Sequence, residues 1–128
     1  MCANKRADRH QFHTAIFVGS DGAVTKCRSN DPAMCAERRL LAALSAQDHG
    51  RMVVVRVAVN RTGICIKSSQ PCGACRDVLV NSGWALRSVI WSTDGGYESC
   101  SPNDVPENAY RAKNSGHVRS GVVCGLCM

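Results

Sequence analysis

Two short segments of this chain carry residues that could form a catalytic metal site. Cys35-Ala36-Glu37-Arg38 is the first, and Pro71-Cys72-Gly73-Ala74-Cys75-Arg76 is the second. Three thiols at these spacings can supply three ligands of a tetrahedral zinc ion, which leaves the fourth position for water. Glu37 follows the first thiol by two residues and can exchange a proton with that water. The sequence therefore predicts metal ligands at Cys35, Cys72 and Cys75 and a catalytic carboxylate at Glu37.

The predicted ligands need thiolate rather than thiol, and their surroundings favour ionisation. Each motif is expected to open a helix, whose free N–H groups stabilise an anion. Cys72 and Cys75 lie three residues apart and would point the same way from one helical turn. Arg38 is predicted to withdraw electron density from the sulfurs by hydrogen bonding. Pro71, with its fixed φ, would stiffen the start of the helix that carries two ligands.

Together the two motifs resemble the signature of the zinc-dependent cytidine deaminase family, H/C-x-E with P-C-x-x-C. The form Cys-Ala-Glu-Arg with Pro-Cys-Gly-Ala-Cys-Arg is most similar to its nucleoside branch, which includes the blasticidin S deaminases. The resemblance implies one zinc per chain and hydrolysis at C4 of a cytosine ring, a C–N bond of a cyclic amidine. It also implies substrate contacts at Asn30, Ala36 and Phe12, and a homotetramer in which neighbouring subunits help to close each pocket.

Three alternatives remain open at this point. A structural zinc module would need a fourth ligand, for which Cys27, Cys65 or Cys100 is available, but it leaves Glu37 without a role. A redox CxxC leaves Cys35 without one. A deaminase of single-stranded DNA or RNA is compatible with the net charge of +6. The basic residues are scattered, however, and only six residues are aromatic, whereas single-strand binders stack bases on aromatic side chains.

Hydrophobic periodicity and turn residues predict the elements that would position these motifs. Two strands, a hairpin around Ser20-Asp21-Gly22, come first. A helix capped by Asp31 runs to Gln47, and a buried central strand then covers residues 52–59. The second helix spans about 72–81. In chain order the predicted strands are 14–18, 23–27, 52–59, a short extension at 64–66, then 86–92 and 97–101.

This order predicts an α/β protein with a mixed sheet, because strand–helix–strand units pack their helices back onto the sheet. The resemblance makes this expectation specific: a cytidine deaminase-like three-layer α/β/α fold with a central mixed five-stranded sheet. At 128 residues the chain is expected to form one domain, 1–128, with 1–11 and about 113–128 flexible. Trp84 and Trp91 are assigned to the core or an interface, and Tyr110 to closure of the pocket.

Nine cysteines, an odd number, occur without an apolar signal segment or a stretch long enough to cross a bilayer. This favours a cytoplasmic protein whose thiols are reduced or bind metal, without structural disulfides. The pair Cys124 and Cys127, with His117 upstream, is interpreted as free thiols. Apolar residues around the second helix (Val78, Leu79, Val80 and Trp84) are expected to lack a covering helix, which also favours a dimer or tetramer.

Overall fold

A computed structural model describes residues 8–31 and 34–110. A six-stranded mixed sheet forms the frame of these residues, with two helices packed against it. The strands are β1 (Asp8–Gly19), β2 (Val24–Ser29), β3 (Gly50–Asn60), β4 (Gly63–Lys67), β5 (Leu86–Thr93) and β6 (Gly96–Cys100). The helices are α1 (Ala36–Ala43) and α2 (Gly73–Leu79), and a short 3₁₀ turn covers Pro102–Asp104. The α/β class and the mixed sheet are as predicted.

The strand order is β2-β1-β3-β5-β6, and β4 pairs with β3 outside this path. β3 is central, as predicted: it runs antiparallel to β1 and parallel to β5. Only the β3–β5 pair is parallel, because α2 crosses over between these two strands. Gly50 begins β3 where it passes Gly19, and a side chain there would collide with the Val18 carbonyl. The close approach explains why a glycine stands at this position.

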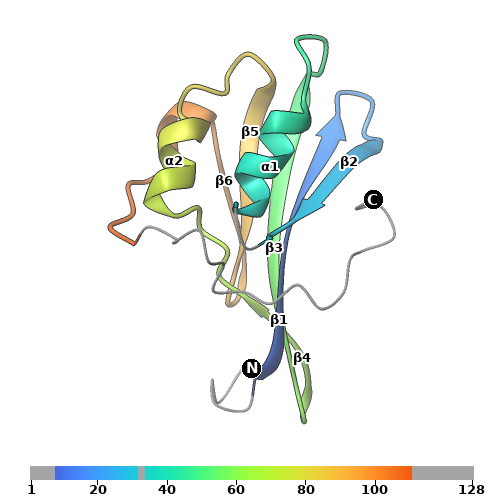
Figure 1. Cartoon of the computed structure of the whole chain (residues 1–128), viewed down its shortest axis with the longest axis vertical. Coiled ribbons are helices and arrows are strands. Elements are labelled where there is room, and N and C mark those ends of the chain that lie inside the picture. The colour runs from blue at the N-terminus through green and yellow to red at the C-terminus, as the bar shows by residue number, and fades with distance from the viewer. Residues whose placement is uncertain (1–7, 32–33, 111–128) are drawn as a thin grey trace.

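The prediction of five strands is wrong by one. The stretch 64–66, interpreted as a short extension, is strand β4, which continues the sheet beyond the helices as a hairpin with β3 (Figure 1). Asn60 Oδ1 accepts the Thr62 N–H at 2.9 Å and so stabilises the turn between them. β1 begins at Asp8, so residues 8–11, predicted to be flexible, extend that strand.

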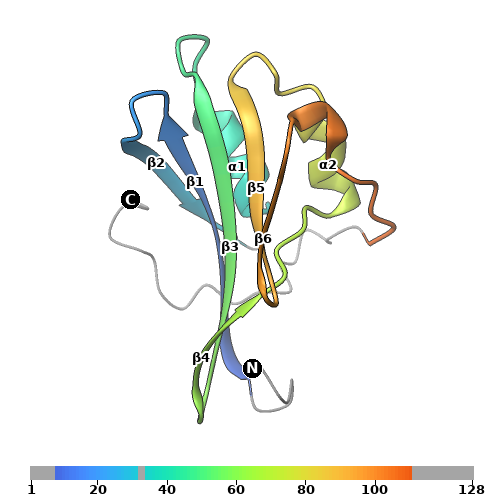
Figure 2. The same cartoon turned by 180° about the vertical axis from the view of Figure 1, so that it is seen from behind.

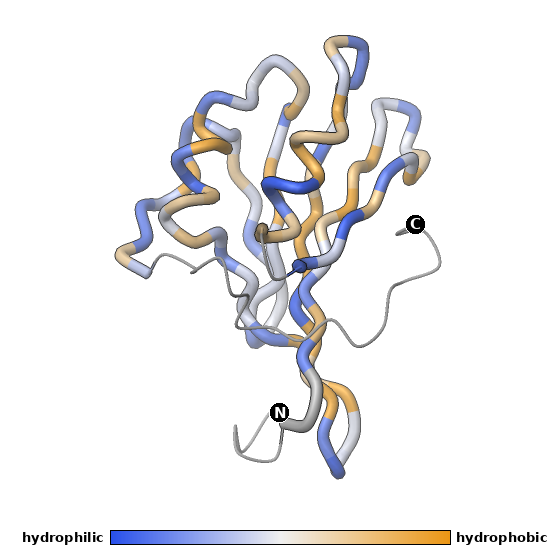
Figure 3. The backbone as a smooth tube through the Cα atoms, viewed as in Figure 1, coloured by the Kyte–Doolittle hydropathy of each residue, from blue (hydrophilic) through white to orange (hydrophobic). Residues whose placement is uncertain are grey.

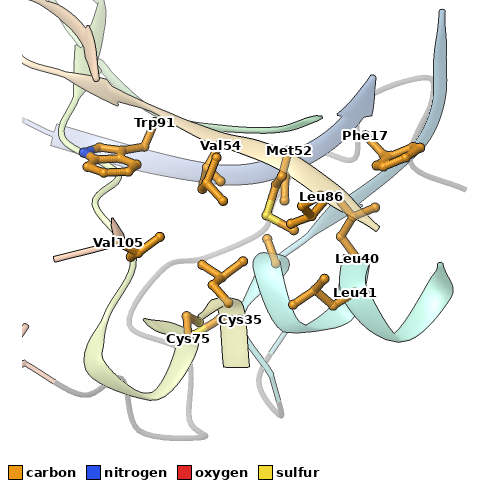
Figure 4. Packing of buried hydrophobic residues seen from close by; sticks show 14 of the residues in the cluster. Phe17, Cys35, Leu40, Leu41, Met52, Val54, Cys75, Leu86, Trp91 and Val105 are labelled. Carbon is orange, nitrogen blue, oxygen red and sulfur yellow. The ribbon is translucent and has the colours of Figure 1, made fainter. Parts of the chain in front are cut away.

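Both helices lie on the same face of the sheet (Figures 1 and 2). The described residues therefore form two layers, and the predicted three-layer α/β/α arrangement is not seen in them because they supply no helix for the second face. The core lies between the helices and alternate residues of β1, β3 and β5 (Figure 4). Leu40, Leu79, Met52, Val54 and Val89 are completely buried there.

Each helix ends earlier than its periodicity predicts. α1 stops at Ala43 rather than Gln47, and Asp48 Oδ2 accepts the Ser45 N–H at 2.7 Å in the loop that follows. α2 stops at Leu79, whose carbonyl accepts a hydrogen bond from Ser82 Oγ at 2.6 Å. In both cases a serine or aspartate side chain bonds the local backbone and offers it an alternative to another helical turn.

Candidate metal centre and pocket

The three cysteines predicted as ligands come together at the N-terminal ends of the two helices. Cys35 is the N-cap residue of α1, Cys72 is the N-cap residue of α2, and Cys75 lies one turn further along α2. Their sulfur atoms all lie within 4.8 Å of one another, and all three residues are buried. Among the described residues this is the one such group that could hold a metal ion. Figure 4 shows Cys35 and Cys75 side by side at the edge of the core.

The three neighbouring thiols affect one another's ionisation. The neighbouring thiols of Cys35 and Cys72 and then burial raise the pKa of Cys75 far above its usual range. The contact with Cys72, together with burial, also raises the pKa of Cys35, although Cys75 and Arg38 oppose that shift. Three thiolates this close repel one another, so their joint ionisation requires a positive charge among them.

A divalent cation with sulfur ligands fits this arrangement. In a tetrahedral zinc site with Zn–S distances of about 2.3 Å, the sulfur atoms lie roughly 3.8 Å apart, within the limit observed here. Arg38 adds a second positive charge, because its Nη2 lies 3.5 Å from Cys35 Sγ. That contact raises the pKa of Arg38, as expected for a guanidinium beside a thiolate.

No fourth protein ligand joins the cluster among the described residues. Cys100 is a free, half-buried thiol outside the cluster. Cys27 and Cys65 are disulfide-bonded, so the prediction of no structural disulfides is wrong for these two, and neither can close the tetrahedron. The Cys124–Cys127 pair and His117 lie outside the described residues. A metal ion held by these three cysteines would therefore have a coordination position that no described residue fills.

Glu37 lies beside the thiols in the first turn of α1 and is almost completely buried, with 1% of its side chain exposed. Its Oε1 atom has no hydrogen-bond partner. His13 Nε2 lies 3.3 Å from it, in an orientation that does not meet hydrogen-bond geometry. A buried carboxylate oxygen without a bonded partner is costly, which is typical of an atom kept for a ligand.

The cluster and Glu37 open into a cavity of about 210 Å³. Its wall combines sulfur, carboxylate, imidazole and guanidinium groups with amides and hydroxyls, contributed by His13, Cys35, Glu37, Arg56, Ser68, Gln70, Cys72, Asn108 and Tyr110. Burial lowers the pKa of the Arg56 guanidinium, and the charge of Glu37 opposes that shift. Tyr110, assigned to the pocket from the sequence, is at its wall, and its carbonyl accepts the Gly73 N–H at 2.8 Å.

Among the other residues expected near the substrate, Asn30 and Ala36 bond each other. The Ala36 N–H donates to Asn30 Oδ1 at 2.6 Å, which satisfies the start of α1. Pro71 is buried next to Cys72. Phe12 is not among the lining residues. Since successive strand residues face opposite sides of the sheet, its neighbour His13 occupies the inward position instead.

Sequence reasoning did not assign five of the residues at the cavity wall: His13, Arg56, Ser68, Gln70 and Asn108. His13 and Arg56 are the two of these that can carry a charge. They are cross-strand partners in β1 and β3, 43 positions apart, and His13 Nδ1 lies 3.4 Å from Arg56 Nη2. One signal was available: Arg56 is the one charge within the apolar run 52–59. A charge at an inward position of a buried strand needs a polar environment.

Comparison with protein-family models and with curated proteins finds no match to this chain. The described residues define an α/β domain with a buried three-cysteine group that could hold a metal ion. None of the helices in the described part of the chain is long and apolar enough to cross a membrane.

Proposed function

We propose that this protein is a zinc-dependent hydrolase that deaminates a cytosine nucleoside or a nucleoside-like compound, such as cytidine, deoxycytidine or blasticidin S, and releases ammonia. The observation that carries the proposal is the position of Glu37. Glu37 has a buried carboxylate oxygen without a hydrogen-bond partner and lines a cavity beside three thiols, which no fourth protein ligand joins among the described residues. A structural metal site needs no such carboxylate.

In this mechanism Cys35, Cys72 and Cys75 would hold the zinc ion, which would supply Lewis acidity toward a water molecule in the pocket. Glu37 would accept a proton from water as the water oxygen bonds to C4 of the ring, and would deliver that proton to N3. It would then move the proton of the new C4 hydroxyl to the amine, so that ammonia leaves as the C4–N bond breaks and the C4 carbonyl forms. One carboxylate can serve each step because it is regenerated between them. Because Glu37 is buried in low-dielectric surroundings, it would not exchange these protons with bulk water.

The size of the cavity also supports a small substrate. Its volume, about 210 Å³, is below the range of roughly 300–1,000 Å³ that is typical of pockets for drug-sized ligands. Ser68, Gln70 and Asn108 at the wall offer the hydroxyl and amide groups that fix the orientation of a polar ring.

A panel assay tests the proposal. Zinc-loaded protein is incubated with cytidine, deoxycytidine, blasticidin S and a cytosine-bearing oligonucleotide, and ammonia release is measured for each. We expect release from at least one of the three small compounds, with little dependence on salt. Activity on the oligonucleotide alone, falling steeply with salt, would favour the polynucleotide alternative, since phosphate contacts release counterions. Bound zinc without ammonia from any compound would favour a structural metal module.

A further inference from the structure

Glu37 is in contact with His13, a residue that has no role in the mechanism described so far. The two side chains are 6% and 1% exposed, and their Nε2 and Oε1 atoms face each other at 3.3 Å. Neither atom has a hydrogen-bond partner. At this distance, a small rotation of either side chain would allow a hydrogen bond between the two atoms. Each atom is therefore available to the other when a ligand enters the pocket.

Arg56 determines which nitrogen of His13 carries the proton. Arg56 Nη2 lies 3.4 Å from His13 Nδ1. A guanidinium can only donate hydrogen bonds, so Nδ1 must be the accepting, unprotonated nitrogen. The proton of the neutral imidazole is then on Nε2, the nitrogen that faces Glu37.

Backbone hydrogen bonds hold both His13 and Arg56 in place. His13 and Arg56 are opposite one another in the β1–β3 register, so their side chains share one face of the sheet. The His13 carbonyl accepts the Asn30 N–H at 3.1 Å, and the Arg56 N–H donates to Ser92 Oγ at 3.2 Å. The imidazole is therefore anchored to rigid strands rather than to a loop.

We propose that His13, held as its Nε2–H tautomer by Arg56, is a positioning residue that orients the Glu37 carboxylate for proton transfer. Its N–H fixes one carboxylate oxygen and turns the rest of the group toward the open side of the cysteine cluster. This inference rests on the proposed deaminase function, because it assigns His13 a role through Glu37. A carboxylate that passes protons to N3 and to the departing amine must hold one orientation toward both. A carboxylate fixed in that orientation therefore reacts faster than one that rotates freely.

Variants of His13 test the kinetic part on zinc-loaded protein. His13→Gln places an amide N–H near the Nε2 position, whereas His13→Asn places it near Nδ1 and cannot reach Glu37. We expect His13→Asn to lower kcat by about 10- to 100-fold with KM and zinc content nearly unchanged, since a hydrogen bond to a charged group is lost. His13→Gln is expected to recover most of that loss. Gln11→Ala, on the same strand but outside the cavity wall, is the matched control.

A double-mutant cycle shows whether His13 acts through Glu37. In the Glu37→Gln background, His13→Asn is expected to cause no further loss of kcat, because the carboxylate that it orients is already gone. An equal loss in both backgrounds would overturn the proposal, as would a His13→Asn enzyme with normal kcat.

The tautomer is tested without any substrate. Long-range ¹H–¹⁵N NMR of the imidazole ring distinguishes Nε2–H from Nδ1–H, and we expect Nε2–H in the wild type and a loss of this preference in Arg56→Met. An Nδ1–H ring in the wild type would contradict the proposal. If no compound in the panel is deaminated, the proposed function fails, while the NMR result still decides whether the His13 geometry is correct.

Discussion

Glu37 is one of the largest completely buried side chains in the described part of the chain, although it carries an ionisable group. Buried carboxylates in proteins usually have hydrogen-bond partners for both oxygens, because desolvating the charged group costs several kcal/mol. The exception has a physical explanation here if Glu37 exchanges protons with a ligand in the adjoining cavity.

Replacing Glu37 with glutamine therefore has a specific expected outcome. The amide has the same shape, so Glu37→Gln should retain the fold and bound zinc, but it cannot accept the proton and should lose about 10²- to 10⁴-fold in kcat. Measurement of kcat beside zinc content and circular dichroism checks this. Near-normal turnover in the variant would remove Glu37 from the mechanism.

The cysteine cluster gives a second prediction at the same scale. Cys35→Ser should abolish stoichiometric zinc binding and lower the unfolding temperature of the zinc-loaded protein, because metal binding stabilises only the folded state. Cys100→Ser is the matched control, since this free thiol lies outside the cluster. Zinc content by elemental analysis and thermal unfolding are the measurements. Equal zinc content in the two variants would rule out Cys35 as a ligand.

At the residue scale, sequence reasoning located what local spacing can encode. Cys35 and Glu37 lie on one helical turn, and so do Cys72 and Cys75, and the structure places these four together. Sequence reasoning did not assign His13 and Arg56, because these two residues are brought together only by the β1–β3 register. Phe12 was predicted to contact the substrate, whereas the residue of this strand at the cavity wall is its neighbour His13, which faces the opposite side of the sheet.

At the scale of elements, the loop after α1 shows why helix ends are difficult to predict. The apolar pattern continues past Ala43, but Asp48 accepts the backbone N–H of Ser45 and lies 3.3 Å from Lys26 Nζ. Such side-chain bonds compete with helical ones and leave no trace in hydrophobic periodicity.

Asp48→Asn should make this loop less stable in a pH-dependent way. The hydrogen bond from Ser45, with smaller help from Lys26, lowers the Asp48 pKa below its ordinary value of 3.8. The carboxylate therefore stabilises the fold above pH 3.8, and this contribution is lost as the pH falls through the lower pKa of the folded state. Urea unfolding at neutral pH should show the variant to be less stable than the wild type. The difference should shrink well below pH 3.8, and a constant difference would contradict the assignment.

The segment before α2 is held by a buried pair of hydroxyl groups. Ser69 Oγ lies 2.8 Å from Ser92 Oγ and accepts the Ser92 N–H at 2.9 Å. Ser92 Oγ in turn donates to the Lys67 carbonyl at 2.7 Å. These bonds attach the stretch that leads to Cys72 to strand β5.

Ser69→Ala should lower the free energy of unfolding by about 1–3 kcal/mol, because it leaves a buried N–H without this acceptor. It should also weaken zinc binding, since the chain leading to Cys72 is less firmly held. Urea unfolding and competition with a zinc chelator measure the two effects. Ser99→Ala, at an exposed position of β6, is the control and should change neither.

At the scale of the whole molecule, the two faces of the sheet differ. The helices cover one face, and hydrophobic colouring continues from the central strands into the β3–β4 hairpin (Figure 3). Ile64 and Ile66 in that hairpin are 75% and 44% exposed. Of the apolar residues expected to lack cover near α2, Val78 and Trp84 are exposed, but Leu79 is completely buried in the core. Tertiary packing, which periodicity does not report, decides between such neighbours.

We expect this exposed apolar surface to support self-association, as predicted from the sequence. Light scattering at micromolar concentration should give a mass above the 13.8 kDa of one chain. Ile64→Arg should shift the protein toward monomer, because it places a charge on apolar surface. Tyr97→Arg, at a similarly exposed position on edge strand β6, is the control. A fully active wild-type monomer would show that each pocket is complete in one chain.

The β1–β3 pairing also has a kinetic consequence. It joins residues 8–19 to residues 50–60, so the part of the chain with Cys35 is a closed loop between paired strands, and Cys72 and Cys75 follow it. Such distant pairings form slowly, because loop-closure entropy is lost before the contacts are gained. We therefore expect the three sulfurs to meet late in folding, after β3 and β5 have paired. A metal ion held by these sulfurs would stabilise the native state but not the transition state for folding. It would therefore slow unfolding and leave the rate of folding almost unchanged.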